Sequence, residues 1–324
     1  MNNKKNILFT STFITSFIRD DISLLSRTHT IVTVTTSGVK ALASYLLLLA
    51  TAEITFSWFA SVYSSLLVLA GKLFRKKSIL ILGGVDVAKI PELHYGIWNS
   101  RWKSVIVGFG IRRANAVLAV DNSLRLDAMH LAHYDGRNII VVPTGYDHRK
   151  WFSVPAAKEE FVLTVASCPT ETRWKIKGID FLLGVAAEMP ATNFILAGVN
   201  SEIAKHHTVP GNLSILPFVS QDELLALYQR AKVYFQPSLR EGLPNSLCEA
   251  MLCECYPVGT NVGGIPTAID DTGSLVGYGN ISDAVTAIRI GLRVNGSPKT
   301  RLRIMTEFSL EKRFEHLSTI INAL

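Results

Sequence analysis

Two glutamates, Glu241 and Glu249, have the residue type and spacing that most directly indicate chemistry in this sequence. They enclose the segment EGLPNSLCE, which follows a short apolar, strand-like run. The glycine and proline in this segment favour a loop, and Asn245 or Ser246 is a residue type that caps helix starts. A helix that begins here points free backbone N–H groups and the positive end of its dipole outward. Such a helix start suits a diphosphate.

Glu249 has two interpretations at this stage. Ser246 followed three residues later by Glu249 matches the capping box, in which the glutamate side chain hydrogen-bonds back to the helix start. In the other interpretation the carboxylate contacts a ligand. Glu241 lies in a Gly/Pro loop after a strand, where capping does not explain it, and it is therefore the stronger candidate.

Lys177 and Asp86 also follow strand-like runs. Lys177 lies in WKIKGID, where a lysine at a helix start is by residue type alone an ordinary surface residue. Asp86 lies in GGVDVA, after the apolar run Ile79 to Leu82. It either orients an acceptor hydroxyl or contacts a sugar, or it caps the next helix.

The sequence offers no motif for a metal. It has four cysteines, and none forms a Cys-x-x-Cys pair or adjoins a histidine ligand set. We therefore expect buried, reduced thiols and a reducing compartment. No Asp-x-Asp element is present to hold a divalent ion against a diphosphate. We expect neither a metal nor another cofactor.

Short, β-branched apolar runs alternate with helix-like segments along the whole chain, which favours parallel sheets covered on both faces. In the first half the expected strands are Asn6–Thr10, Ile31–Thr35, Ile54–Trp58, Ile79–Leu82, Ala116–Val120 and Ile139–Val142. In the second half they are Phe161–Ala166, Asn193–Ala197, Leu213–Leu216, Val233–Gln236 and Tyr256–Thr260.

The chain length of 324 residues predicts two domains. A turn-rich, charged stretch places their boundary near Pro155, which gives domains at 1–155 and 156–300. Residues 301–324 read as a terminal helix that packs back on the first domain. We expect two doubly wound Rossmann-like sheets that face a cleft, with ligands at the carboxyl ends of the strands.

A net charge of +7 and basic clusters in the first half, such as Lys72 to Lys77 and Arg101 to Arg113, indicate either a solvated surface or a face for an anionic membrane or acceptor. The apolar stretch Ala41–Ala70 is interrupted by Glu53, so we expect helix Leu42–Ala50, a buried strand and helix Ala60–Leu73 instead of a membrane span. The expected location is cytoplasmic, peripheral at the inner face of the membrane.

The segment from Glu241 resembles the Glu-x7-Glu signature of the retaining glycosyltransferases of family 4, the glycosyl transferases group 1, which have the GT-B fold. The match continues through YPVGT at Tyr256 to Thr260, VGGIP at Val262 to Pro266 and GSLV at Gly273 to Val276. The resemblance therefore covers Glu241 to Val276 rather than one short motif.

This resemblance implies a hexosyltransferase that takes a nucleoside-diphosphate sugar, UDP or GDP based, and a glycan or lipid-linked acceptor in surface polysaccharide or glycolipid synthesis. It implies no metal, retention at the anomeric carbon and no nucleic-acid partner. Glu241 would hold donor-sugar hydroxyls, Glu249 the ribose hydroxyls and Lys177 the diphosphate. The sugar and diphosphate would lie on the backbone of Gly242, Leu243, Pro244, Asn245 and Ser246, and Phe218 and Val219 would adjoin the nucleobase.

The sequence departs from the family pattern at two places. The first strand of the second half ends VASC, without the arginine that the family places there, and Arg173 is the substitute that we propose. Pro217 stands where a glycine is usual beside the nucleobase. Two alternatives stay open, namely a GT-B epimerase or hydrolase and a catalytically weak partner subunit that binds nucleotide sugar.

Overall fold

The computed structural model describes residues 4–35, 44–45 and 47–324. Its contacts divide the chain into unit 1, which is Met1–Gly145 with Leu310–Leu324, and unit 2, which is Tyr146–Ser309. The boundary that we predicted near Pro155 lies inside unit 2. Residues 301–324 are divided between the two units because the helical segment is interrupted near Ser309.

Unit 1 contains a six-stranded sheet in the order β2-β1-β3-β4-β5-β6, with every pair parallel. Its strands are β1 (Asn6–Ser11), β2 (Thr30–Thr35), β3 (Ile54–Trp58), β4 (Lys77–Leu82), β5 (Ala116–Ala119) and β6 (Ile139–Val141). The central strands β3, β4 and β5 are buried almost throughout, which explains why they read as continuous apolar runs.

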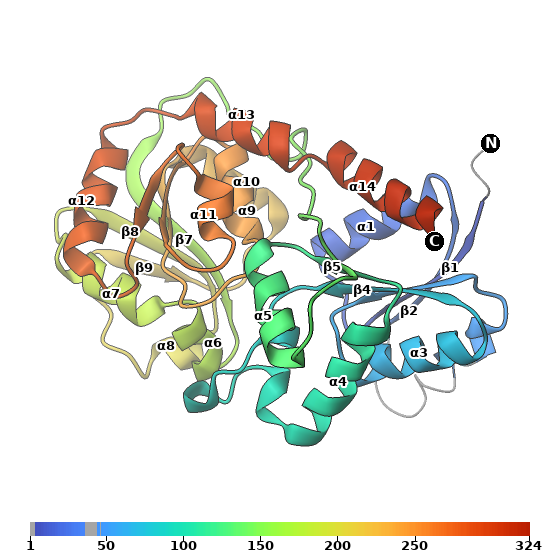
Figure 1. Cartoon of the computed structure of the whole chain (residues 1–324). Coiled ribbons are helices and arrows are strands. Elements are labelled where there is room, and N and C mark those ends of the chain that lie inside the picture. The colour runs from blue at the N-terminus through green and yellow to red at the C-terminus, as the bar shows by residue number, and fades with distance from the viewer. Residues whose placement is uncertain (1–3, 36–43, 46) are drawn as a thin grey trace. The chain divides into compact units, whose positions relative to one another are not determined.

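Helices cover both faces of this sheet (Figure 1). They are α1 (Ser16–Ser26), α3 (Val62–Leu73), α4 (Arg101–Arg113), α5 (Asn122–Ala132) and α14 (Leu310–Ala323), with short 3-10 turns at Val85–Val87, Pro91–Leu93 and Ile97–Asn99. In Figure 1, α1 and α14 lie above the sheet and α3 and α4 below it. Part of the predicted helix Leu42–Ala50 lies outside the described residues, whereas 44–45 and 47–49 are helical.

Unit 2 contains a second all-parallel, six-stranded sheet in the order β12-β11-β10-β7-β8-β9. Its strands are β7 (Glu159–Cys168), β8 (Asn193–Val199), β9 (Leu213–Leu216), β10 (Ala231–Gln236), β11 (Tyr256–Thr260) and β12 (Ser274–Val276). Its helices are α6 (Glu171–Ile176), α7 (Ile179–Ala187), α8 (Ser201–Ala204), α9 (Gln221–Arg230), α10 (Asn245–Leu252), α11 (Ile265–Ile269), α12 (Ile281–Leu292) and α13 (Pro298–Glu307). The predicted α/β class with two doubly wound parallel sheets is confirmed.

The four cysteines are unpaired and buried, as the sequence predicted. Burial raises the pKa of the Cys248 thiol to about 12, so this thiol is neutral near pH 7. Among the described residues, no helix combines the length and the apolar character needed to cross a bilayer.

A buried ion pair fixes α14 to unit 1. The Arg313 guanidinium donates to both carboxylate oxygens of Asp21 in α1, at 3.0 and 2.8 Å, and it also donates to the Val142 and Pro143 carbonyls. Asp21 accepts a further hydrogen bond from the Trp58 indole. Because both charged side chains are almost fully buried, each depends on the other for compensation.

We expect Arg313→Met to lower the free energy of unfolding by about 3–5 kcal/mol, because it leaves the Asp21 carboxylate buried without its cation. Urea denaturation measures this loss, with the exposed Glu315→Gln on the same helix as control. The double variant Asp21→Asn/Arg313→Met should lose less unfolding free energy than Arg313→Met alone. A single variant as stable as the control would contradict this role for the pair.

Candidate active site

The candidate site of unit 2 lies where the strand order reverses. From β7 the chain proceeds to β8 and β9 on one side, whereas from β10 it proceeds to β11 and β12 on the other. β7 and β10 are neighbours, and the carboxyl ends of such a strand pair form the crevice in which open α/β sheets bind ligands. Lys177 follows β7 and Glu241 follows β10, so the topology brings these two predicted residues together.

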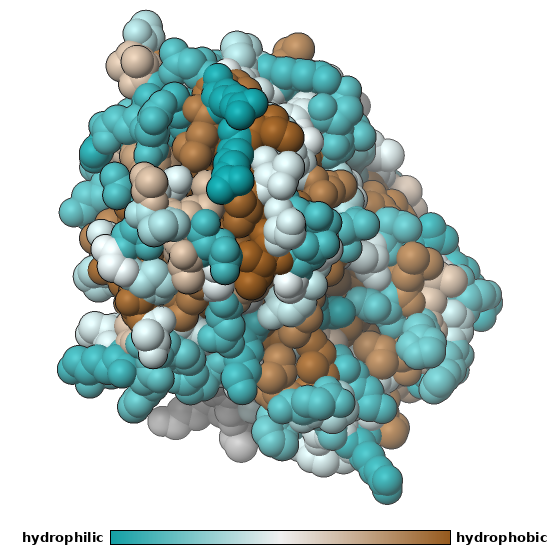
Figure 2. All heavy atoms as spheres, turned by 90° about the vertical axis from the view of Figure 1, so that its left-hand side faces the viewer, coloured by the Kyte–Doolittle hydropathy of each residue, from teal (hydrophilic) through white to brown (hydrophobic). Residues whose placement is uncertain are grey.

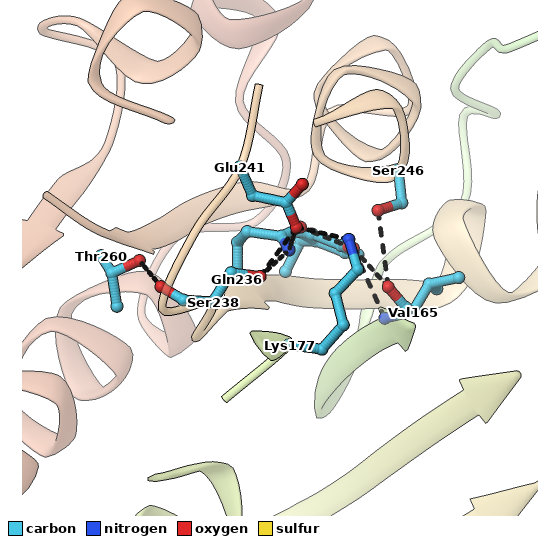
Figure 3. A network of polar contacts seen from close by, with 8 residues as sticks. Val165, Lys177, Gln236, Ser238, Glu241, Ser246 and Thr260 are labelled. Carbon is cyan, nitrogen blue, oxygen red and sulfur yellow. Dashed lines mark hydrogen bonds and ion pairs between the residues drawn. The ribbon is translucent and has the colours of Figure 1, made fainter. Parts of the chain in front are cut away.

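Lys177 and Glu241 form an ion pair (Figure 3). The distance from Lys177 Nζ to Glu241 Oε1 is 2.5 Å, and the two side chains are 15% and 11% exposed. A cation and a carboxylate shielded to this extent interact more strongly than a surface pair, since water screens them less. The exposed fraction that remains leaves both side chains accessible to a ligand.

Glu241 Oε1 is also the acceptor for two neutral side chains. Ser238 Oγ donates to it at 2.8 Å and Gln236 Nε2 at 3.2 Å. Gln236 is itself held by the Tyr234 hydroxyl, which donates to Gln236 Oε1 at 3.2 Å. All interactions of Glu241 with described side chains thus converge on Oε1, and Figure 3 shows Oε2 turned away from the network. Oε2 remains available to accept from a ligand hydroxyl.

Neighbouring loops fix the backbone that carries Glu241. Thr260 Oγ1 donates to the Ser238 carbonyl at 2.6 Å, and the Gly264 N–H donates to the Gly242 carbonyl at 2.8 Å. Gly263 has φ = +55°, and a Cβ on it would lie 2.1 Å from the Glu241 carbonyl oxygen. Only glycine permits both this backbone conformation and this close approach.

We expect Gly263→Ala to displace the Glu241 loop and to destabilise the protein more than Gly279→Ala does. Gly279 is the matched control, because it also has a positive φ, +80°, but its Cβ would meet nothing within 4 Å. Both variants carry the backbone strain, about 1 kcal/mol, and only Gly263→Ala adds the clash. Urea denaturation of the two variants measures the difference. Equal losses of unfolding free energy in the two variants would show that the Glu241 loop accommodates a Cβ at position 263.

Helix α10 begins at Asn245, after the N-cap residue Pro244, so neither Asn245 nor Ser246 is the cap that the sequence suggested. Pro244 provides no side-chain cap, so the first backbone N–H groups of α10 lack the usual capping acceptor. The capping-box interpretation of Ser246 is therefore wrong: proline takes the N-cap position, and Ser246 Oγ instead donates to the Val165 carbonyl at 3.5 Å. Asn245 Oδ1 accepts from the Tyr146 hydroxyl at 2.9 Å.

Glu249 lies one turn further along α10 and is 9% exposed. Its Oε2 accepts a hydrogen bond from the Tyr228 hydroxyl at 3.2 Å, within the core of unit 2. Burial and the nearby Glu249 carboxylate together raise the pKa of Tyr228, so Tyr228 stays a neutral donor. Tyr228 thereby orients the Glu249 carboxylate.

Arg173 lies in α6, close to the carboxyl end of β7. Burial raises the pKa of Cys168 to about 11, and the positive charges of Lys177 and Arg173 oppose this rise. Both cations therefore act on the same strand end. Among the described residues Arg173 makes no salt bridge, unlike Lys177. The substitution that we proposed for the missing arginine is compatible with this position.

Phe218 and Val219 follow β9, which is separated from β10 in the sheet by the two strands β7 and β8. Phe218 is 89% exposed, and Val219 is partly buried. An exposed aromatic ring in a loop at the carboxyl end of a strand provides a flat surface on which a base can stack.

Asp86 belongs to unit 1, in the 3-10 turn after β4. Its carboxylate accepts hydrogen bonds from the backbone N–H groups of Ala60, Gly83 and Gly84. It is almost fully buried, and burial raises its pKa although these hydrogen bonds oppose the rise. In this position Asp86 organises two loops through their backbone, whereas its predicted contact with acceptor or sugar stays a prediction.

Sequence reasoning missed the side chains that support the two glutamates, namely Gln236, Ser238, Tyr234 and Tyr228. A glutamine and a serine at the end of an otherwise apolar strand are a signal that was available for two of them. The described residues include no group of three or more His, Cys, Asp or Glu side chains arranged to hold a metal ion.

Residues 160–293, within unit 2, match the family model described as glycosyl transferases group 1. Among curated proteins, the chain is 24% identical over 174 residues to the phosphatidylinositol N-acetylglucosaminyltransferase gpi3 subunit of Schizosaccharomyces pombe, covering 51% of this chain and 38% of that protein. It is 28% identical over 139 residues to the D-inositol 3-phosphate glycosyltransferase of Mycobacterium leprae, covering 39% and 32%. The chain thus spans about a third of the length of these relatives.

Solved structures match nearly the whole chain. HepE of Anabaena, crystallised with UDP, superposes with a TM-score of 0.79 at 14% identity, over 98% of this chain and 100% of that one. Sucrose-phosphate synthase of Thermosynechococcus elongatus gives a TM-score of 0.76 at 12% identity, over 99% of each chain. At such identities these matches establish the fold, which is GT-B with two Rossmann-like units. The family model that residues 160–293 match is the one that the motifs indicated, so the sequence of unit 2 is similar to the glycosyl transferases group 1.

Proposed function

We propose that this protein is a retaining, metal-independent glycosyltransferase that moves a hexose-type sugar from a nucleoside-diphosphate sugar to a glycan or lipid-linked acceptor. The observation that carries the proposal is the Lys177–Glu241 pair at the strand reversal of unit 2, with Glu241 Oε2 available for a hydroxyl. The family match supports the reaction class. UDP and UDP-glucose, which are present in the HepE crystal structures, support a UDP-sugar donor over the GDP alternative.

The charges of the site suit the donor diphosphate. Lys177 and Arg173 supply cations beside the carboxyl end of β7, and the uncapped N–H groups of α10 supply a positive helix end. The leaving nucleoside diphosphate gains negative charge as the glycosidic bond breaks, so fixed positive groups stabilise the transition state more than the ground state. This arrangement performs the charge neutralisation without a divalent ion.

The carboxylates suit the neutral parts of the donor. Glu241 Oε2 accepts from sugar hydroxyls, while Oε1 stays bound to Lys177, Ser238 and Gln236. Glu249, oriented by Tyr228, accepts from the ribose hydroxyls, and Phe218 stacks on the base. The backbone from Gly242 to Ser246 surrounds the sugar and diphosphate. In a retaining reaction of this kind the leaving phosphate takes the acceptor proton, and no separate protein base is needed.

The acceptor assignment rests on the family and on the relatives. The two curated relatives are named for transfer to phosphatidylinositol and to inositol phosphate, which favours a lipid-linked or phosphorylated acceptor over a free sugar. We place the reaction in surface polysaccharide or glycolipid synthesis, at the cytoplasmic face of a membrane. Asp86 is the residue of unit 1 that we assign to the acceptor side, where it shapes the loop after β4.

Lys177→Met should weaken the binding of both UDP and UDP-glucose, because it removes the cation and leaves Glu241 unpaired beside the phosphates. Glu241→Gln should weaken UDP-glucose only, and UDP should bind at least as tightly as before because Lys177 is no longer neutralised. Titration calorimetry measures the affinities, with exposed Lys175→Met as control.

A thermal-shift screen with UDP, GDP and ADP identifies the base, since a ligand at a hundred times its dissociation constant adds about 2.7 kcal/mol of stability. Absence of any shift would count against donor binding.

Glu241→Ala and Lys177→Ala should each reduce transfer about 100-fold or more, the range found when one electrostatic stabiliser of a transition state is removed. Release of nucleoside diphosphate, measured with and without lipid-linked or glycan acceptors, reports the turnover, and circular dichroism confirms the fold. Unchanged turnover in both variants would refute the assignment. Equal release with donor alone would instead indicate a hydrolase, and donor binding without release a partner subunit.

A further inference from the structure

Helices α3 and α4 lie side by side on one face of the unit 1 sheet (Figure 1). Each connects adjacent strands in the same direction, β3 to β4 and β4 to β5, so right-handed crossovers place both on the same side. They touch where Gly110 meets Ser65, since a Cβ on Gly110 would lie 2.3 Å from Ser65 Oγ. Their outward sides thus form one surface, which we call the α3–α4 surface and define by residues 62–77 and 101–113.

The α3–α4 surface exposes large apolar side chains. Leu73 is 78% exposed, Val105 69%, Trp102 60%, Phe74 58% and Leu69 49%. Leu69 and Leu73 are four residues apart on α3, and Trp102 and Val105 are three apart on α4, so the two members of each pair lie on the same side of their helix. Grouped exposure of this kind marks an interaction site in soluble proteins.

The same surface is basic without acidic compensation. Its two segments contain no Asp or Glu and carry the cations Lys72, Arg75, Lys76, Lys77, Arg101, Lys103, Arg112 and Arg113. None of these cations forms a salt bridge with any other residue that the structure describes. The surface is therefore both apolar and uniformly positive.

The first turn of α4 argues that this charge serves an external partner. Arg101 and Lys103 stand at the helix start, where the helix dipole favours acidic residues, and the turn contains no acidic residue. The arrangement is unfavourable for the isolated helix. An anionic partner at this surface would offset that cost.

A basic cavity of about 530 Å³ adjoins the ends of both helices. Lys72, Arg112, Arg113 and Arg137 line it together with Tyr134 and two asparagines. No Asp or Glu is among the described residues that line it, and Asp135, close by in sequence, is paired with Arg137 at 3.3 Å. The cavity is large enough for a phosphate headgroup and provides the cations to bind one.

We propose that the α3–α4 surface docks this protein on an anionic lipid bilayer. The exposed leucines, Phe74, Trp102 and Val105 enter the interfacial region, and the surrounding cations, including those of the basic cavity, contact lipid phosphates. A soluble polyanion would need the cations but not the apolar side chains, and this favours lipid as the occupant. The proposal names the membrane surface of the protein and does not depend on the proposed transfer reaction.

Co-sedimentation of the full chain with vesicles tests the proposal. Binding should be strong to phosphatidylcholine vesicles that contain phosphatidylglycerol, weak to phosphatidylcholine alone, and should fall as salt increases. Neutralising Lys103 and Arg113 with Lys103→Gln/Arg113→Gln should weaken binding about fivefold for each lost charge. Leu73→Ser/Trp102→Ser should also weaken it, and the tryptophan fluorescence of the wild type should shift to the blue on binding.

Matched controls come from α12 of unit 2. Figure 2 shows this side of unit 2, where apolar residues appear in several patches between hydrophilic ones. Arg289→Gln and Ile290→Ser, whose side chains are exposed, should leave vesicle binding unchanged. All variants should retain their UDP-glucose affinity, so failure of the donor assignment and failure of this one remain distinguishable.

Two results would overturn the proposal. Equal binding to both vesicle types would exclude anionic lipid as the determinant. If Leu73→Ser/Trp102→Ser binds vesicles like the wild type while charge removal abolishes binding, the surface is a site for a soluble polyanion instead, and heparin competition would then show it.

Discussion

The site of unit 2 depends on one shielded ion pair, Lys177 with Glu241. The cation holds the carboxylate through Oε1, and Ser238 and Gln236 complete the coordination of that same oxygen. A carboxylate shielded from water in this way needs such compensation, because desolvation penalises its charged form. The consequence is a glutamate with one oxygen committed to the protein and one directed elsewhere (Figure 3). This division allows a single residue to be both rigid and available for binding.

The sheet topology explains why the pair forms at all. Lys177 and Glu241 are far apart in sequence, and they meet because β7 and β10 are neighbours at the reversal of strand order. The close approach of Gly263 to the Glu241 carbonyl and the hydrogen bond from Thr260 to Ser238 then fix the loop. Unit 1 shows the same principle in Asp86, which is a buried carboxylate saturated by backbone donors. In both units a carboxylate organises loops at the carboxyl ends of parallel strands.

The two units carry different kinds of surface. Unit 2 concentrates its chemistry at the β7 and β10 ends, whereas unit 1 exposes apolar and basic residues on α3 and α4. A donor that is soluble and an acceptor that is lipid-linked would require such a separation of roles. The buried pair Arg313–Asp21 makes the last helix of the chain part of unit 1, so the chain contributes to this unit from both of its ends.

The sequence by itself determined the α/β class, because buried parallel strands read as short β-branched runs, and β3, β9 and β11 begin and end where the pattern predicted. It also singled out Glu241 by its place in a Gly/Pro loop after a strand, whereas Lys177 became a candidate only through the resemblance to the glycosyl transferases group 1. Only the tertiary structure decided which group the Glu249 carboxylate binds within the fold. Its spacing from Ser246 fits a capping box, yet Pro244 takes the N-cap position and Tyr228, from another helix, binds the carboxylate. The contacts of Tyr228 with Glu249 and of Lys177 with Glu241 join elements that are far apart in sequence, and local sequence patterns do not encode which distant side chain will complete a buried interaction.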